Sequence, residues 1–337
     1  AWQTAIGLQD VDGLKPSSYL IDTAKRHIEG DVTIEEVKGL IDTYYQSHQG
    51  RLSVEDERTE EADKVSARIT ELLQEETFSF TPAEYQRIHR KLFEGIFKFA
   101  GKYRDYNISK EEWVLNNDSV LYNPYENLKE TLDYDFAEER KFDYASATTD
   151  ESIKHIGSFI AGIWQIHPFG EGNTRTTAVF LIKYLRSFGY TISNELFASH
   201  SWYFRNALVR AGYFNREKGI VPTGKYLEAF LRNLILGEHN ELRNRYLHVD
   251  YPAQSDTSDI AKGQIDTLNV TLEERAVLNL IVSNPKAKQV EIASKIGKSD
   301  RTVKRIMDSL KEKGLIARRG SKRDGWWDVL IELPEAQ

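Results

Sequence analysis

Apolar residues in the first 248 positions recur every three or four residues, which is the spacing of amphipathic helices. Residues 21–45 contain two such stripes, and Thr33 with Glu36 forms a capping-box pattern at the start of the second. The same spacing runs through 57–73 and again through 81–97. The pattern therefore predicts a mainly α-helical body.

The helical spacing is interrupted between residues 106 and 122. Apolar and polar residues alternate there on both sides of Asn116-Asn117-Asp118, a sequence that favours a tight turn. We therefore expect a short β-hairpin. Because an isolated hairpin is marginally stable by itself, it must lie against the helices, as a flap over a site would.

A second interruption separates two strong helical stripes. Residues 153–166 predict a buried helix, and residues 167–174 contain a proline and two glycines, which require a tight turn. Helical spacing then resumes. We expect Asn173 or Thr174 to cap this next helix and Gly189 to end it.

The C-terminal part of the chain has a different organisation. Residues 249–259 are polar and lack apolar periodicity, as a linker does. Three helices are then predicted at 272–282, 289–296 and 299–313, with a strand pair over 315–330, an order that resembles a winged helix-turn-helix domain. The expected boundaries are 1–80 for an N-terminal helical region, 81–248 for a helical domain, 249–270 for a linker and 271–337 for the winged helix.

The charge changes at the same boundary. The whole chain carries a formal charge of -7. Residues 271–337 contain 14 Lys and Arg against 10 Asp and Glu, a net of +4, so residues 1–270 carry -11. A chain that is acidic overall therefore contains a basic C-terminal module, and the charge of this module suits an anionic partner.

Composition excludes several kinds of site. The chain has no cysteine, which excludes disulfides, thiolate metal sites, iron-sulfur clusters and cysteine nucleophiles. No apolar run approaches the roughly 20 residues of a membrane span, and the first residues do not form a signal peptide. We expect a cytoplasmic protein with no membrane partner.

The loop at 167–174 contains residues suited to phosphate chemistry. A glycine-rich turn before a helix presents unpaired backbone amides at the positive end of the helix, and Arg175 and Asn173 add donors for an anion. Glu171 would repel phosphates unless a divalent cation such as Mg²⁺ lay between them. His167 titrates near neutral pH, so it is a candidate general base. Together these residues indicate transfer of a phosphorus group to a hydroxyl. A plain turn between two helices beside a structural histidine is the alternative.

The residues His167-Pro-Phe-Gly-Glu-Gly-Asn-Thr-Arg175 resemble the signature of the Fic (Fido) family, His-Pro-Phe-x-Asp/Glu-Gly-Asn-Gly-Arg-x-x-Arg. The resemblance extends over about residues 85–240 and implies a Fic-type helical domain with a β-hairpin flap. It implies transfer of AMP from Mg-ATP to a Ser, Thr or Tyr hydroxyl of a protein, including the chain itself. It also implies roles for individual residues: His167 as general base, Glu171 as Mg²⁺ ligand, Phe169 as the anchor of the loop, and Gly170, Gly172, Asn173, Thr174 and Arg175 at the phosphates.

The sequence departs from this signature at two positions. Thr174 replaces a glycine, which a helix start tolerates, and Ala178 replaces the second arginine, which in the family contacts the terminal phosphate. The loss of that arginine leaves other donors open, namely UMP, phosphate or phosphocholine. It also leaves open a DNA-binding regulator whose Fic site only senses a nucleotide.

Three further predictions concern residues outside the motif. Glu57, in a sequence close to the family's inhibitory helix, is a candidate inhibitory residue, although an acidic solvated run is the alternative. Trp202 and Tyr203 are candidates for contact with the nucleotide base, or else core aromatics. His155 and His200 have no motif around them and are expected to be structural.

In the basic tail, the third predicted helix buries one face and exposes cations on the other. Such a helix suits the major groove of DNA, with the strand pair on phosphates, although a module for protein contacts or a homodimer is the alternative. The candidate DNA contacts are Arg301, Lys304, Arg305, Arg318 and Arg319, and Lys322 and Arg323 add to the basic character of the strand pair.

Overall fold

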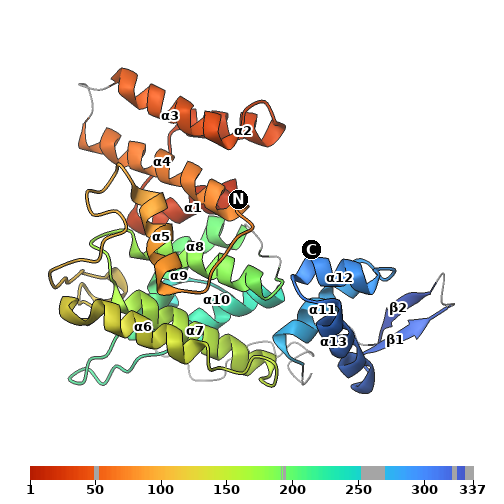
Figure 1. Cartoon of the computed structure of the whole chain (residues 1–337). Coiled ribbons are helices and arrows are strands. Elements are labelled where there is room, and N and C mark those ends of the chain that lie inside the picture. The colour runs from red at the N-terminus through yellow and green to blue at the C-terminus, as the bar shows by residue number, and fades with distance from the viewer. Residues whose placement is uncertain (49–52, 191, 193–194, 252–269, 321–324, 331–337) are drawn as a thin grey trace.

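The computed structural model describes residues 1–48, 53–190, 192, 195–251, 270–320 and 325–330 (Figure 1). Its described residues are mostly helical, as predicted. The helices of the body are α1 (Trp2–Gly7), α2 (Ser18–Glu29), α3 (Ile34–His48), α4 (Val54–Gln74), α5 (Pro82–Phe93), α6 (Leu128–Glu139), α7 (Thr149–Ile166), α8 (Asn173–Ser187), α9 (Glu195–Gly212) and α10 (Lys225–Leu236). Short 3-10 helices are η1 (Leu8–Asp12), η2 (Trp113–Leu115), η3 (Tyr125–Asn127) and η4 (Asn244–Leu247).

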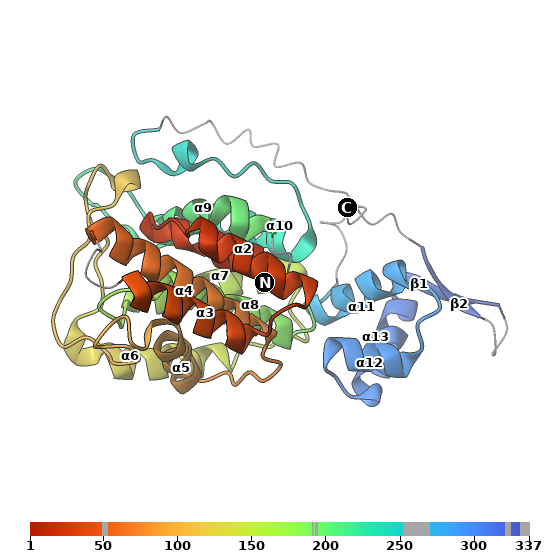
Figure 2. The same ribbon diagram turned by 90° about the horizontal axis from the view of Figure 1, so that it is seen from above.

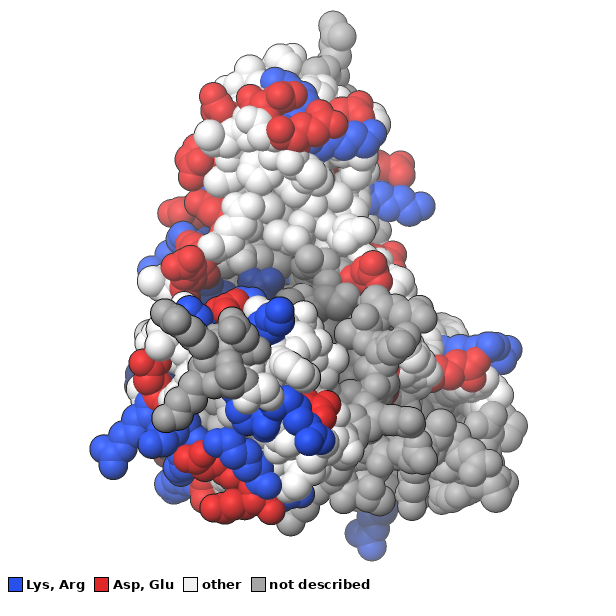
Figure 3. Space-filling view, turned by 90° about the vertical axis from the view of Figure 1, so that its right-hand side faces the viewer, with Lys and Arg blue, Asp and Glu red and all other residues white. Residues whose placement is uncertain are grey.

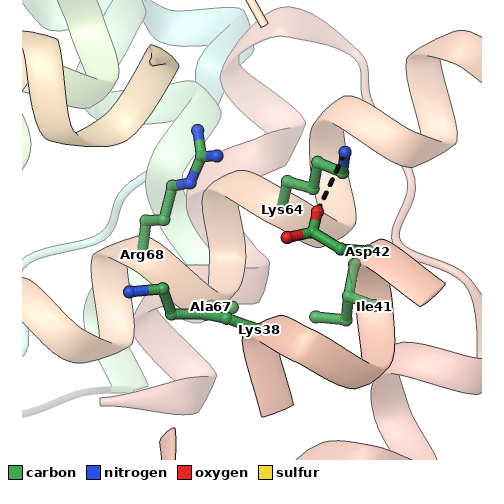
Figure 4. A pocket seen from close by; sticks show the side chains of 6 residues that line it. All are labelled: Lys38, Ile41, Asp42, Lys64, Ala67 and Arg68. Atoms are coloured by element: carbon green, nitrogen blue, oxygen red, sulfur yellow. Dashed lines mark ion pairs between the residues drawn. The ribbon is translucent and has the colours of Figure 1, made fainter. Parts of the chain in front are cut away.

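Helix α3 packs on α4, and α2 packs on α3, at one end of the body (Figure 1). The predicted capping box is present, because Glu36 accepts a hydrogen bond from the Thr33 amide and Thr33 accepts one from the Glu36 amide. A small pocket between α3 and α4 is lined by Lys38, Ile41, Asp42, Lys64, Ala67 and Arg68 (Figure 4). Its volume of about 30 Å³ holds roughly one water molecule.

Helix α8 lies at the centre of the body, and its buried residues run from Asn173 to Leu185 without interruption. Helices α4, α5 and α7 pack against it, and α9 packs on α7, α10 and α1. A helix that is buried all round needs apolar residues on every face, and α8 carries Val179, Phe180 and Leu181 in succession. The start of α8 is therefore held rigidly by its neighbours.

The segment predicted as a β-hairpin has only part of that geometry. Asn116 and Asn117 adopt left-handed backbone conformations, which confirms the turn. One isolated bridge joins Glu112 to Asp118, and the 3-10 helix η2 occupies the place of the expected strand. The prediction of two strands was wrong. Val114 and Leu115 are both fully buried, whereas a strand would have turned one of them to solvent.

Helix α5 is also shorter than its apolar pattern suggested. It starts at Pro82, capped by Thr81, and it ends at Phe93 rather than continuing to Phe97. Gly95 has a φ of +75°, which a helix does not allow, and the chain turns there. This turn brings residues 97–104 under the loop at 167–172.

The C-terminal module has the predicted winged-helix order. It contains α11 (Leu272–Ser283), α12 (Gln289–Ile296), α13 (Asp300–Glu312) and an antiparallel pair of β1 (Ile316–Arg319) and β2 (Trp326–Val329). Ile316 pairs with Val329, and Arg319 pairs with Trp326. The buried face of α13 is the predicted one, formed by Val303, Ile306, Met307 and Leu310.

This module lies against the far end of α8, as both ribbon views show (Figures 1 and 2). The hydroxyl of Tyr190 donates to the carbonyl of Leu272 at 2.7 Å, and the amide of Thr149 donates to Val270 at 3.0 Å. Gly189 meets Ile296 so closely that a Cβ would lie 2.7 Å from it. The predicted linker at 249–270 falls mainly on residues 252–269, outside the described part of the chain.

Within the described residues, every helix is too short or too polar to cross a membrane.

Candidate active site

Helix α7 ends at Ile166, and the chain reverses through six residues before α8 begins at Asn173. His167 has a left-handed φ of +51°, which is uncommon for a residue with a side chain. Gly172, with φ of +79°, occupies the cap position that the sequence had suggested for Asn173 or Thr174. Because glycine adopts this conformation without a steric penalty, the loop can feed directly into the helix.

The imidazole of His167 is held inside the protein with one nitrogen free. Its Nδ1 lies 3.2 Å from the carbonyl oxygen of Trp164, and only 2% of the residue is exposed. A carbonyl can only accept, so Nδ1 carries the proton and Nε2 has the lone pair. Among the described residues Nε2 has no hydrogen-bond partner. Burial holds the pKa of His167 well below its usual value, and Lys110 adds to this effect. The ring is therefore neutral and able to accept a proton.

Arg104 fixes the conformation of His167. Its guanidinium donates to the carbonyl oxygens of His167 at 2.8 Å and of Tyr106 at 2.6 Å, and further to those of Ile166 and Asn123. One side chain thus joins the motif loop to both ends of the segment at 106–123. No sequence signal marks Arg104, because it lies outside the motif and its role depends on carbonyls 2 to 63 positions away.

His89 of α5 forms the floor of the loop. Its Nδ1 accepts from the amide of Gly101 at 2.8 Å, so its Nε2 must donate to the carbonyl of Glu171, 2.9 Å away. The ring stacks on Phe169 at 3.7 Å between centroids. Burial lowers the pKa of His89 to about 4. His89 therefore stays neutral at physiological pH and holds the peptide of Glu171. A polar residue on the buried stripe of α5 was the only sequence signal for it.

The side chains predicted to bind phosphate are used within the protein. Asn173 accepts from the amide of Phe169 and donates to its carbonyl, which closes the loop. The hydroxyl of Thr174 accepts from the indole of Trp164 at 3.0 Å. Gly170 lies so close to the Tyr106 hydroxyl that a Cβ would be 2.8 Å from it. The groups that remain available to an anion here are the backbone amides at the first turn of α8.

Arg175 is fully buried and bound on all sides. Its guanidinium lies 2.8 Å from a carboxylate oxygen of Asp12 and 2.7 Å from one of Glu61, and it donates to Gln9 at 3.1 Å. It also stacks over the ring of Phe93. In this structure Arg175 ties the N-terminal segment and α4 to the motif helix.

Two positions differ from the Fic pattern: residue 178 is not the second arginine, and Glu57, in the part of the chain that the structure describes, is not in contact with the motif. Ala178 is fully buried within α8 and has no charge. Glu57 is exposed on α4, and no described contact links it to the motif. It is Glu61, one turn further along α4, that contacts a motif arginine. The inhibitory role of Glu57 therefore stays a prediction, without a contact to the motif among the described residues.

Glu171 lies at the mouth of the loop. Its Oε1 accepts from the amide of Gly172 at 3.2 Å and from the ammonium of Lys110 at 2.8 Å. The described residues contain no group of three or more His, Asp or Glu that could hold a metal. A lone carboxylate fits Mg²⁺ that is held mainly by the phosphates of a nucleotide.

The two aromatic candidates have different surroundings. Tyr203 is 2% exposed, stacks on Phe230, and donates to the carbonyl of Tyr226. Its position in the core leaves no face for a nucleotide base, which corrects that prediction. Trp202 is partly exposed under the guanidinium of Arg205, so it remains a candidate.

The two histidines expected to be structural, His155 and His200, have contacts of that kind. His155 lies 2.7 Å from Glu139 and stacks on Phe142 at 3.7 Å. His200 lies at a kink in α9 beside Ser199.

A cavity of about 360 Å³ lies beside Tyr122, whose ring packs on His167. Two stretches of residues 106–124, called the flap segment from here on, line this cavity: 107–109 and 119–124. Tyr122, at its wall, packs its ring 4.3 Å from that of His167. The hydroxyl of Tyr122 is buried and has no partner among the described residues. Tyr122 Oη and His167 Nε2 are therefore two buried, unpaired polar atoms on neighbouring rings, and Tyr122 also lines the cavity.

The candidate DNA contacts lie on the surface of the winged helix. All five, Arg301, Lys304, Arg305, Arg318 and Arg319, are exposed. Figure 3 looks at the molecule from this side and shows basic side chains over the module nearest the viewer, with acidic ones between them. Arg318 stacks over Trp327, and Arg319 pairs with Asp328 at 3.0 Å. Lys322 and Arg323 lie outside the described residues.

Comparison with known proteins matches the helical body and the C-terminal module to two different families. Residues 79–185 match the Fic/DOC family, and residues 274–317 match a family described as winged helix-turn-helix DNA-binding. A probable protein adenylyltransferase, y4lH of Sinorhizobium fredii, is 32% identical over 116 residues. Protein adenylyltransferase VbhT of Bartonella schoenbuchensis is 30% identical over 107 residues.

These matches cover only part of each protein. They span 34% of this chain and 56% of y4lH, and 32% of this chain and 21% of VbhT. A crystal structure of a Fic family protein from Desulfovibrio desulfuricans aligns over 98% of this chain and 87% of its own, at 11% identity and a TM-score of 0.41. Residues 79–185, which contain the His167 loop, therefore match the Fic/DOC family, and residues 274–317 match a winged helix-turn-helix family.

Proposed function

We propose that the chain is a protein adenylyltransferase, which transfers AMP from ATP to a Ser, Thr or Tyr hydroxyl of a protein. The observation that carries the proposal is the state of His167: neutral, oriented through Nδ1, and with an unpaired Nε2 beside an anion-binding helix start. The two relatives named protein adenylyltransferase support the same activity.

In the proposed reaction the oxygen of the target hydroxyl attacks the α-phosphorus of ATP. The bond from that phosphorus to the α,β-bridging oxygen breaks, and pyrophosphate leaves. His167 Nε2 takes the proton of the hydroxyl, and Nδ1 keeps its hydrogen bond to Trp164. Backbone amides at the start of α8 stabilise the negative charge on the phosphate oxygens.

Glu171 would hold Mg²⁺ that arrives with the nucleotide, and that ion would neutralise charge on the phosphates. The cavity beside the flap, bounded by residues 107–109 and 119–124, is the proposed place for the target segment, because it adjoins His167 through Tyr122. Trp202 is the remaining candidate for contact with the adenine base.

Labelled nucleotides test the reaction. The protein is incubated with candidate protein targets and Mg²⁺ with ATP labelled at either the α or the γ phosphate, and incorporation into protein is measured. Label from the α position alone supports AMP transfer. Label from the γ position alone indicates phosphate transfer. Label from UTP or CDP-choline alone indicates UMP or phosphocholine transfer.

The role of His167 has its own test. His167→Ala should lower transfer by at least about 100-fold, the range of general-base catalysis, and leave nucleotide affinity within a few-fold. His239→Ala is the matched control, since His239 is exposed and lies outside the motif. Equal transfer by the two variants contradicts the base assignment. Nucleotide binding without transfer from any donor supports the sensor alternative.

For the C-terminal module we propose binding to DNA, with α13 in the major groove and β1–β2 on phosphates. The exposed cations of α13 and the family match at residues 274–317 support it. Arg305 lies close enough to Asp143 to contribute to the lowered pKa of that carboxyl, after the hydrogen bonds of Ser146 and Ala145. Because Arg305 already has an acidic neighbour in the helical body, Arg301 and Lys304 are the first residues to test for DNA contact.

A further inference from the structure

One lysine reaches the motif loop from the flap segment. Lys110 Nζ lies 2.8 Å from Glu171 Oε1, across 61 positions of sequence. The Lys110 side chain is 26% exposed and that of Glu171 is 41% exposed, so both can still meet a ligand. The amide of Lys110 donates to Ser119 Oγ at 3.1 Å, which anchors the lysine to the opposite side of the flap segment.

The ammonium group of Lys110 acts on the other charged groups of the site. After burial, Lys110 is the largest cause of the lowered pKa of His167. It also opposes the rise in the pKa of Glu112 that burial causes, after Arg205. The ammonium, 2.8 Å from Glu171, therefore also acts electrostatically on His167 and Glu112.

In the described structure, the two motif positions 175 and 178 offer a nucleotide no free cation. Arg175 is fully buried against Asp12, Glu61 and Gln9, and Ala178 has no charge. A nucleoside triphosphate brings several negative charges, which backbone amides only partly offset. In the described part of the chain, Lys110 of the flap segment is a partly exposed cation in contact with the motif loop.

We propose that Lys110 is a phosphate ligand that takes the part of the arginine missing at position 178. The inference rests on the nucleotide-binding function proposed above. A divalent cation on the nucleotide prefers the carboxylate oxygens of Glu171. Its arrival releases the ammonium of Lys110, whose three donors then face the phosphate oxygens bound to that cation. The lysine exchanges one partner for another, and no covalent bond changes.

Binding of Mg-ATP tests the proposal directly. Lys110→Met keeps the length of the side chain and removes the charge. It should weaken binding of Mg-ATP by about 10-fold or more, the effect of one charge-assisted hydrogen bond, with adenosine affinity unchanged. Lys110→Arg should recover most of the loss. Lys129→Met is the control, because Lys129 is a surface residue of α6 with its side chain 79% exposed. Isothermal titration calorimetry measures all four proteins.

A second readout needs no nucleotide. The ammonium of Lys110 competes with a metal ion for Glu171, so Lys110→Met should bind Mn²⁺ more tightly than the wild type in an electron paramagnetic resonance titration. Equal Mn²⁺ affinity contradicts the exchange of partners.

The outcomes separate this inference from the proposed function. If the wild type binds Mg-ATP and Lys110→Met binds it as Lys129→Met does, Lys110 is a surface ion pair and the inference alone fails. Equal losses for Mg-ATP and adenosine also contradict it, since they indicate a distorted site. If the wild type binds no nucleotide, the proposed function fails and this inference with it.

Discussion

The motif loop and the winged helix both contain cations that suggest an anionic ligand, yet the fold treats them in opposite ways. Arg175 is fully buried between two carboxylates, whereas Arg301 and Lys304 project from the surface of α13. A buried cation is held by its partners and supports the structure, but an exposed one keeps its charge for a ligand. An arginine in a binding motif is therefore a ligand only if the packing leaves it free.

The largest expected effect separates these two kinds of cation by stability. Arg175→Met leaves Asp12 and Glu61 without their cation in a partly buried place, which should lower the free energy of unfolding by about 3 kcal/mol or more. Arg301→Met should change it by no more than about 0.5 kcal/mol. Urea unfolding followed by circular dichroism measures both. A small loss for Arg175→Met would mean that the ion pairs are dispensable and that Arg175 can serve phosphates.

The pH dependence of the free energy of unfolding tests whether His89, which supports the loop, is buried and neutral in the folded protein. Its pKa is about 4 in the folded protein and near 6.5 when unfolded, so the unfolded state binds more protons as the pH falls. Its contribution should be present above pH 6.5 and should be lost progressively down to about pH 4, by about 3 kcal/mol in all.

His89→Gln, which does not titrate, provides the comparison for this dependence. The fall in unfolding free energy between pH 6.5 and 4 should be shallower in the variant than in the wild type. Parallel curves for the two proteins would show that His89 is already solvated or charged in the folded state.

A smaller effect is expected where the motif loop packs most closely. Gly172→Ala would place a Cβ 2.3 Å from the ring of Phe93 and would strain a φ of +79°. Gly237→Ala meets the same backbone strain at +69° with no atom within 4 Å of the added carbon. We expect a loss of about 1 kcal/mol for Gly237→Ala and about 1–3 kcal/mol more for Gly172→Ala. Thermal unfolding of the two variants measures the difference. Equal losses would mean that the Phe93 ring moves aside at little energetic cost.

The smallest effect concerns the exposed cations of the winged helix. Arg301→Ala combined with Lys304→Ala should reduce the slope of log affinity against log salt by about 2, if each residue contacts one phosphate. Lys129→Ala on α6 is the control. Fluorescence anisotropy with duplex DNA over a salt series measures the slope. An unchanged slope would favour protein contacts for this face.

Much of the secondary structure could be predicted because it depends on neighbours in the sequence. The helix at 289–296 and the strand pair around 320 follow from local periodicity and glycine stops. The missing strands at 106–122 show the limit of that reasoning. Val114 and Leu115 are buried where η2 packs against α9 and η4, which no local pattern reveals, and the 3-10 backbone of η2 buries both side chains.

By itself, the sequence determined the chemistry that the loop at 167–175 contains and the separation of a basic module from an acidic body. Both are properties of residue types and their order. Only the tertiary structure decided what each group can do. Burial and the Trp164 carbonyl leave His167 neutral with one free nitrogen, and Asp12 and Glu61 occupy Arg175. Lys110 reaches Glu171 across 61 residues. A side chain's availability depends on partners distant in sequence, and only folding brings those partners together.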